Sequence, residues 1–257
     1  MNVDIEGLPL QIYFVTLQRI VAKATRTTPS LHLWRRELTY ATMRSEEAAH
    51  LQRPYCKGKR ARCKKHSTTM KLILCSQSPR RKELLGALGW PFTVRTAEGI
   101  DESFPPGLSP GETALAIARK KAAAYAATRR MDEVLVTADT IVCLDGEVLG
   151  KPRDEADAIR MLRMLSGRVH EVATGVCIVS NSGTECFAVV TEVEFAQLTD
   201  ETIWRYVQDF RPLDKAGAYG IQEWIGHVGI RTIRGSYDNV VGLPVQELYE
   251  RLCKYMI

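Results

Sequence analysis

Two serines and two arginines lie where an apolar run gives way to an amphipathic basic segment, at Ser76, Ser78, Arg80 and Arg81. This order predicts a strand that leads into a helix, because Ser78 suits the position that caps a helix and Pro79 suits its first turn. The free N–H groups and positive dipole end of such a helix, beside two guanidinium groups, stabilise an anion, most readily a phosphate. An ordinary strand-to-helix turn with solvated arginines explains the same segment equally well, so both interpretations stay open at this point.

Acidic and basic side chains that can act on a phosphate recur further along the chain. Asp139 lies in the middle of the most apolar predicted strand, where a carboxylate is costly unless cations or hydrogen bonds compensate for its burial. Glu102 lies in a polar loop, and lysines follow at Lys121, Lys151 and Lys215. Acids of this kind suit a divalent cation and a water, and the cations suit a polyphosphate, so together they predict hydrolysis of a phosphoanhydride. The alternatives are a structural hydrogen-bonded aspartate at Asp139 and a solvated helix face for Lys121.

The histidines of residues 70–257 argue against two other kinds of site. His170 and His227 lie far apart in different predicted strands. A metal cluster built on histidines, or a Ser-His-Asp site, would need them beside their partner residues.

The chain of 257 residues has a formal net charge of +5, and that charge is unevenly distributed. Residues 1–69 contain 13 Lys and Arg against 5 Asp and Glu, whereas residues 70–257 contain 22 against 25. The second part is therefore slightly acidic, which argues against a nucleic-acid partner there.

Composition also bears on the compartment. No apolar run approaches the roughly 18 residues of a membrane span, and the first residues lack the basic, apolar and small-residue order of a signal peptide. We therefore expect a cytoplasmic protein without a membrane partner. Seven cysteines without regular spacing suggest reduced thiols rather than a disulfide framework.

Apolar periodicity and turn residues predict alternating strands and helices over residues 70–257. Strands are expected at 72–74, 92–94, 133–144, 147–149, 171–179, 185–197 and 227–233, and helices at 79–88, 112–129, 155–165, 200–210 and 244–256. Because helical crossovers and hairpins both occur, we expect an α/β fold with a mixed sheet. A glycine-rich loop at 212–222 should let a ligand approach the backbone.

Residues 1–69 show no sustained helical or strand period. Three interpretations compete: a disordered basic tail, which is the default, a nucleic-acid-binding arm, and an extension upstream of a start at Met70. Cys56, Cys63 and His66 fit no common zinc spacing. We expect 1–69 to be a basic, disordered N-terminal extension and 70–257 to be a complete domain.

Separated motifs in residues 70–257 resemble, in their order, those of the Maf family of nucleoside triphosphate pyrophosphatases. They are Ser76-Gln77-Ser78-Pro79-Arg80-Arg81, Asp101-Glu102, Ala118-Arg119-x-Lys121-Ala122, Ala138-Asp139-Thr140, Gly150-Lys151-Pro152, Thr174-Gly175, Asp214-Lys215-Ala216-Gly217-Ala218-Tyr219-Gly220-Ile221-Gln222 and Val241-Gly242-Leu243-Pro244. The resemblance implies a two-lobed fold similar to inosine triphosphatase, with a nucleotide in the central cleft. It further implies hydrolysis of a nucleoside triphosphate to the monophosphate and pyrophosphate with a divalent metal, Mg²⁺ or Mn²⁺, and it suggests a homodimer.

The resemblance assigns roles residue by residue. Asp139 matches the family's proposed proton acceptor, which activates a water for attack at the α-phosphorus, or instead positions the water or ligates the metal. Glu102 matches an acid near the metal. The phosphate-side positions are matched by Ser76, Arg81, Lys121 and Lys151.

Arg80, Thr140 and Gln222 match the positions that separate the subgroups of the family. These residue types resemble the subgroup that acts on dTTP and UTP, whereas the subgroup that acts on 7-methyl-GTP carries different residues at all three positions. Uracil and thymine share the O2, N3–H and O4 edge, so a glutamine amide and a few backbone groups can bind both. Two alternatives remain: the 7-methyl-GTP subgroup, and a nucleotide-binding regulator of cell division with incidental catalysis.

Overall fold

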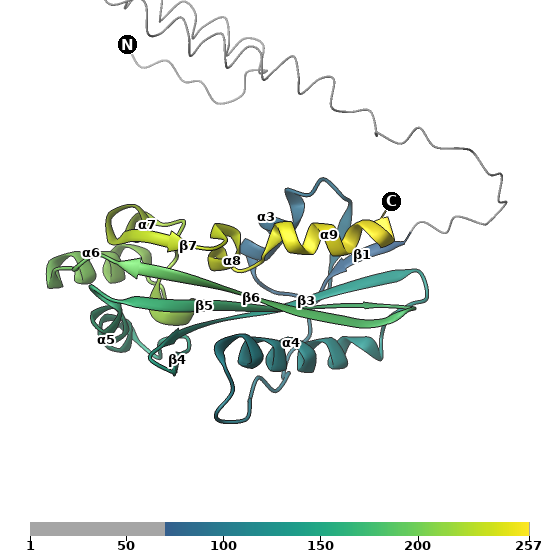
Figure 1. The fold of residues 1–257 in the computed structure, drawn as a ribbon, viewed down its shortest axis with the longest axis horizontal. Helices are drawn as coiled ribbons and strands as arrows, with labels where there is room; N and C mark the ends of the chain where they lie inside the picture. Colours follow the sequence, from purple (N-terminus) through teal and green to yellow (C-terminus); the bar gives the residue numbers. More distant parts are fainter. Residues whose placement is uncertain (1–69, 257) are drawn as a thin grey trace, which may run out of the picture. The chain divides into compact units, whose positions relative to one another are not determined.

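The computed structural model describes residues 70–256 and shows an α/β body built on one mixed sheet (Figure 1). The expectations for residues 1–69 lie outside the described residues. Seven strands form the sheet in the order β2-β1-β3-β5-β6-β7, and β4 pairs with β3. The strands are β1 (Lys71–Leu74), β2 (Phe92–Val94), β3 (Glu133–Leu144), β4 (Glu147–Leu149), β5 (Val169–Ser180), β6 (Gly183–Phe195) and β7 (Ile230–Arg234). The helices are α3 (Pro79–Gly86), α4 (Pro110–Ala126), α5 (Glu155–Leu165), α6 (Asp200–Phe210), the 3₁₀ turn η1 (Ala216–Ala218), α7 (Trp224–Gly229), α8 (Tyr237–Val241) and α9 (Val245–Met256).

The direction of each strand follows from the connection that precedes it. Helices α3 and α4 are crossovers, so β1 pairs in parallel with both β2 and β3. Short turns join β3 to β4 and β5 to β6, and these pairs are antiparallel, as are β3 with β5 and β6 with β7. The predicted α/β fold with a mixed sheet is confirmed.

The long strands β3, β5 and β6 carry apolar side chains on both faces and pass through two lobes. Around one end, which we call the first lobe, α4 covers one face of the sheet, and α3 and α9 cover the other (Figure 1). Leu72 and Leu74 of β1 lie on the α9 face and Ile73 lies on the α4 face, as the alternation of a strand requires. Helices α5 and α6 pack around the other end, the second lobe.

The helix start predicted at Ser78 is confirmed, since Ser78 caps α3. Helix α4 begins two residues before its predicted start, where Ser109 and Glu112 form a reciprocal capping box. The strand predicted at 227–233 is wrong in its first half, which belongs to α7, and α8 occupies residues where no helix was predicted. Both helices are only five or six residues long, too short for apolar periodicity to reveal. Among the helices of residues 70–256, none combines the length and the apolarity needed to cross a bilayer.

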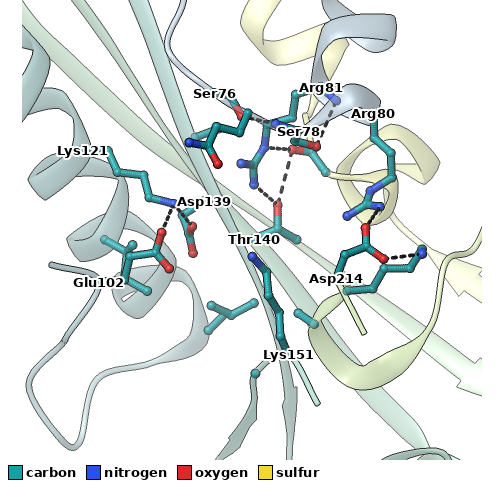
Figure 2. Close-up of a pocket in the computed structure, with 18 of the residues that line it drawn as sticks. Ser76, Ser78, Arg80, Arg81, Glu102, Lys121, Asp139, Thr140, Lys151 and Asp214 are labelled. Carbon is teal, nitrogen blue, oxygen red and sulfur yellow. Dashed lines mark hydrogen bonds and ion pairs between the residues drawn. The ribbon is translucent and has the colours of Figure 1, made fainter. Parts of the chain in front are cut away.

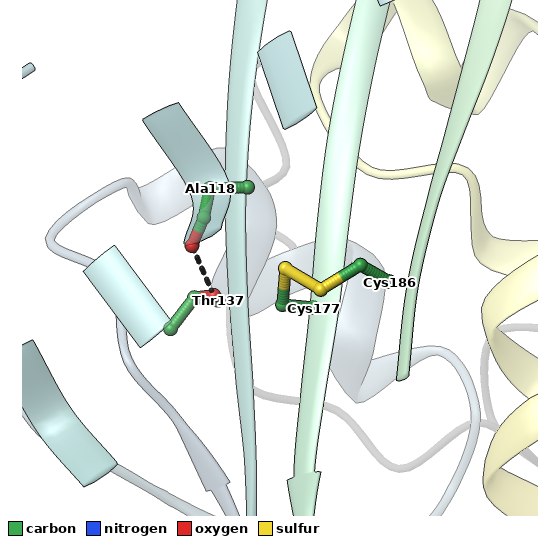
Figure 3. Close-up of a disulfide and its surroundings, with 4 residues drawn as sticks. All are labelled: Ala118, Thr137, Cys177 and Cys186. Carbon is green, nitrogen blue, oxygen red and sulfur yellow. Dashed lines mark hydrogen bonds between the residues drawn. A yellow bond between two sulfur atoms is a disulfide. The ribbon is translucent and has the colours of Figure 1, made fainter. Parts of the chain in front are cut away.

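The expectation of reduced thiols is wrong for one pair. Cys177 of β5 and Cys186 of β6 form a disulfide with their Cα atoms 4.2 Å apart (Figure 3). They lie directly opposite each other in the antiparallel register, and sequence spacing alone does not reveal which residues face each other. Cys75, Cys143 and Cys253 are free.

Candidate active site

The turn between β1 and α3 forms one wall of the site. Ser78 Oγ accepts a hydrogen bond from the Arg81 backbone N–H at 3.4 Å, and the Ser78 backbone N–H donates to Ser76 Oγ at 3.2 Å. Pro79 occupies the first helical turn, where its missing N–H costs no hydrogen bond. The turn therefore holds two serine side chains and the start of α3 at the carboxyl end of β1.

Arg81 turns from α3 toward the sheet, where its guanidinium is held by two oxygens. Its Nε donates to Gly242 O, and its Nη2 donates to Thr140 Oγ1, both at 2.9 Å (Figure 2). Burial lowers the pKa of Arg81 from its usual value, although the charge of Asp139 opposes that shift. A guanidinium nevertheless stays protonated in proteins, so Arg81 supplies a fixed positive charge.

Lys121 of α4 joins two carboxylates on the opposite side of the pocket. Its Nζ lies 2.5 Å from Asp139 Oδ1 of β3 and 2.8 Å from Glu102 Oε1 of the loop before α4 (Figure 2). The side chains of Lys121 and Asp139 are only 15% and 13% exposed, whereas that of Glu102 is 57% exposed. Burial raises the pKa of Glu102, but the hydrogen bond and charge of Lys121, with further cations, lower it more, so its pKa lies below the usual value.

Lys121 reaches Asp139 because α4 lies very close to the sheet. Gly175 of β5 is the register partner of Asp139, and a Cβ added to Gly175 would lie 2.5 Å from the backbone of Ala114 in α4. Thr137 Oγ1 also donates to the Ala118 carbonyl at 3.0 Å, which fastens the middle of α4 to β3 (Figure 3). The lack of a side chain at Gly175 and the Thr137–Ala118 hydrogen bond together set the distance between Lys121 and the sheet.

A second ionic cluster lies at the other wall, where α3 faces the loop that precedes η1. Arg80 Nη1 donates to Asp214 Oδ2 at 2.9 Å, and Lys215 Nζ donates to Asp214 Oδ1 at 2.6 Å (Figure 2). Lys215 Nζ also pairs with Glu223 Oε1 at 3.1 Å. Asp214 and Glu223 were not singled out from the sequence, although Asp214 begins one of the quoted motifs. Only its contact with Arg80, 134 positions away, reveals its place in the site.

All nine residues predicted for the site surround one cavity of about 910 Å³. They are Ser76, Arg80, Arg81, Glu102, Lys121, Asp139, Thr140, Lys151 and Gln222. Lys151 points into the cavity (Figure 2), and among residues 70–256 it has no ion-pair partner. The walls come from both lobes, because α3 and α4 belong to the first and the 214–222 segment packs with the second. A cavity with these donors and cations can hold a polyphosphate.

Comparison with known proteins places the chain in a family. A protein-family model described as Maf-like protein matches residues 71–255. The chain belongs to the Maf family. The resemblance stated from the motifs is therefore confirmed.

Two relatives of this Maf protein are identical to it at about half of the aligned positions, which cover nearly the whole of each relative. A dTTP/UTP pyrophosphatase from Phocaeicola vulgatus is 55% identical over 184 residues, which cover 72% of this chain and 95% of the relative. A protein of the same name from Bacteroides fragilis is 53% identical over 182 residues, 71% of this chain and 94% of the relative. Among solved structures, a HAM1 protein from Coxiella burnetii is 14% identical with a TM-score of 0.40, over 72% of this chain and 99% of its own.

Proposed function

We propose that this Maf protein hydrolyses dTTP and UTP to the monophosphate and pyrophosphate. The observation that carries the proposal is Asp139, a carboxylate 13% exposed in a cavity whose other walls present Arg81, Lys121 and Lys151. A largely desolvated acid among cations suits a reaction in which water attacks a phosphoanhydride. The two relatives named dTTP/UTP pyrophosphatase support the choice of nucleotides.

The phosphates bind among the cations and at the start of α3. Arg81 is held in place by Gly242 and Thr140, so it meets an anion without further ordering of its side chain. Lys151 forms no ion pair among residues 70–256, so its ammonium can bind a phosphate oxygen. Together with the serine-lined turn, these groups neutralise the charge that grows on the leaving pyrophosphate.

Asp139 acts on the water. Its carboxylate accepts a proton while the water oxygen forms a bond to the α-phosphorus, and the bond from that phosphorus to the α–β bridging oxygen breaks. Pyrophosphate leaves with the bonding electron pair. Lys121 contributes by holding Asp139 and Glu102 side by side, which fixes the direction from which the water attacks.

A divalent cation fits this acid pair. Among residues 70–256 no group of three or more His, Cys, Asp or Glu forms a metal-binding cluster. Mg²⁺ needs fewer protein ligands, because it is usually held by one or two carboxylates, substrate phosphates and waters. Asp139 and Glu102, which both reach the same lysine nitrogen, are the residues that would hold Mg²⁺ or Mn²⁺. When bound, the cation supplies positive charge to the phosphate oxygens.

The experiment is a pyrophosphate-release assay with the full chain, Mg²⁺ or Mn²⁺, and dTTP, UTP, 7-methyl-GTP and purine triphosphates. We expect dTTP and UTP to be preferred, and Asp139→Asn to lower kcat by about 10²- to 10⁴-fold, the usual contribution of a general base. Asp209→Asn is the matched control, since Asp209 is a 56% exposed acid that pairs with Arg205 on α6.

Two results would contradict the proposal. If no nucleotide releases pyrophosphate, or if Asp139→Asn keeps the full rate, the catalytic assignment is wrong. A preference for 7-methyl-GTP would contradict the substrate assignment and leave the chemistry standing.

A further inference from the structure

The hydrolytic step described above leaves the ionic cluster of Arg80, Asp214, Lys215 and Glu223 without a role. Asp214, with its side chain 57% exposed, lines the cavity and pairs with both Arg80 and Lys215, so neither of these cations is free for a phosphate. Its presence at this wall therefore marks a part of the cavity that the phosphates do not occupy. The inference developed here rests on the proposed function.

A series of paired side chains connects Asp214 to the second lobe. Lys215, with its side chain 9% exposed, pairs with both Asp214 and Glu223. Glu223 Oε2 in turn accepts a hydrogen bond from the hydroxyl of Tyr206, a fully buried residue of α6. That hydroxyl also accepts from the Gly220 backbone N–H at 3.0 Å. A carboxylate anchored through three successive groups to the core has a defined position.

The same contacts decide what Asp214 offers to a ligand. Burial raises the pKa of Asp214, but the hydrogen bonds from Lys215 and Arg80 lower it more, so its pKa lies below the usual value and the group stays ionised at neutral pH. An ionised carboxylate only accepts hydrogen bonds. Each oxygen already accepts one, from Arg80 or from Lys215, and keeps further lone pairs for a ligand in the cavity.

The position of Asp214 fits the base of the nucleotide. Figure 2 shows Asp139 and Asp214 at opposite sides of the cavity, with Arg81 and Thr140 between them. When the α-phosphate lies at Asp139, the sugar and the base extend away from it. A base at the Arg80–Asp214 pair meets a donor and an acceptor side by side, which together carry little net charge.

We propose that Asp214 accepts a hydrogen bond from the ring N3–H of uracil or thymine and thereby excludes cytosine. In uracil and thymine this N–H stands between two carbonyl oxygens, so an acceptor flanked by the Arg80 guanidinium is complementary to the edge. Cytosine has a lone pair at N3 in place of the hydrogen, which would face the carboxylate lone pairs. A fixed acceptor therefore distinguishes the two pyrimidines by a repulsive contact as well as by an attractive one.

The test compares UTP with CTP in wild-type protein and in Asp214→Asn. An asparagine amide can turn either its oxygen or its NH₂ group toward the ring, so the ratio of kcat/KM for UTP to that for CTP should fall by about tenfold or more. Asp200→Asn is the matched control: Asp200 is an exposed acid that pairs with Arg163 on α5, and its variant should keep the wild-type ratio.

A binding measurement separates this inference from the proposed function. Calorimetric dissociation constants for α,β-methylene-UTP and α,β-methylene-CTP, which cannot be cleaved at the scissile position, report base discrimination without turnover. The inference is overturned if Asp214→Asn leaves the UTP-to-CTP ratio unchanged in binding, including the case in which both nucleotides weaken equally. Wild-type protein that binds α,β-methylene-UTP in preference to the CTP analogue but releases no pyrophosphate would refute the proposed function alone.

Discussion

Gly175→Ala tests whether the distance between α4 and the sheet controls catalysis. The added Cβ would lie 2.5 Å from the carbonyl carbon and oxygen of Ala114 and from the Leu115 nitrogen. These are backbone atoms and cannot rotate away, so α4 must move off β5 by about 1 Å to reach an ordinary contact distance. Overpacking of this kind costs about 1 to 3 kcal/mol of unfolding free energy. For a domain of this size, that lowers Tm by roughly 2 to 12 °C.

The same shift carries Lys121 away from Asp139, because both Ala114 and Lys121 belong to α4. A displacement of about 1 Å at a reacting group can lower the rate on the order of 10²-fold. We therefore expect a fall in kcat that exceeds any rise in KM, measured by pyrophosphate release from UTP well below the new Tm.

Gly86→Ala is the matched control, since its Cβ would meet only Phe92 at 3.9 Å, near the end of α3. That variant should melt at or slightly above the wild-type temperature, because alanine restricts the unfolded chain. If Gly175→Ala melts and turns over like wild type, α4 does not lie this close to β5 and the positioning argument for Lys121 is wrong.

The remaining predictions concern residues 1–69 and the effect of low pH on the stability of the folded protein. We propose that residues 1–69 are dispensable, so a chain that begins at Met70 should match the full chain in Tm and in kcat/KM; an unfolded or inactive product would contradict this. Burial lowers the pKa of His170 to about 4 from its usual 6.5, so the folded state resists protonation. The free energy of unfolding, measured with urea, should have its full value above about pH 6.5. It should fall by up to about 3 kcal/mol as the pH drops to 4. The His170→Gln variant, whose amide can still form a hydrogen bond with the Tyr219 hydroxyl, should lose less stability over this pH range. An equal loss in the variant would show that His170 is not the source of the acid sensitivity.

The nine residues predicted for the site line one cavity, and some of them carry a local chemical signal in the sequence. Ser78 and Pro79 define a helix start by their own backbone preferences, and Asp139 is conspicuous as a charge in an apolar strand. The motif order added Lys121 and Lys151 through family resemblance, and the structure places both at the same cavity. Their catalytic and binding roles stay predictions for the assays above.

Other features could not be predicted because they depend on contacts between distant parts of the chain. The Arg80–Asp214 ion pair joins residues 134 positions apart, and the Cys177–Cys186 disulfide depends on the register of β5 with β6. Residues 227–229 belong to the short helix α7 where a strand was expected, since a single helical turn and a strand end have similar apolar spacing.

By itself, the sequence determined the α/β class, the order of the strands and longer helices, and the capped start of α3. These features follow from backbone preference and periodicity within a few residues. Only the tertiary structure decided which charges meet. The close approach of α4 at Gly175 places Lys121 beside Asp139, and the meeting of α3 with the 214–222 segment places Arg80 beside Asp214. Such pairings depend on strand register and on the distance between a helix and the sheet, which are properties of the packed molecule rather than of any one segment.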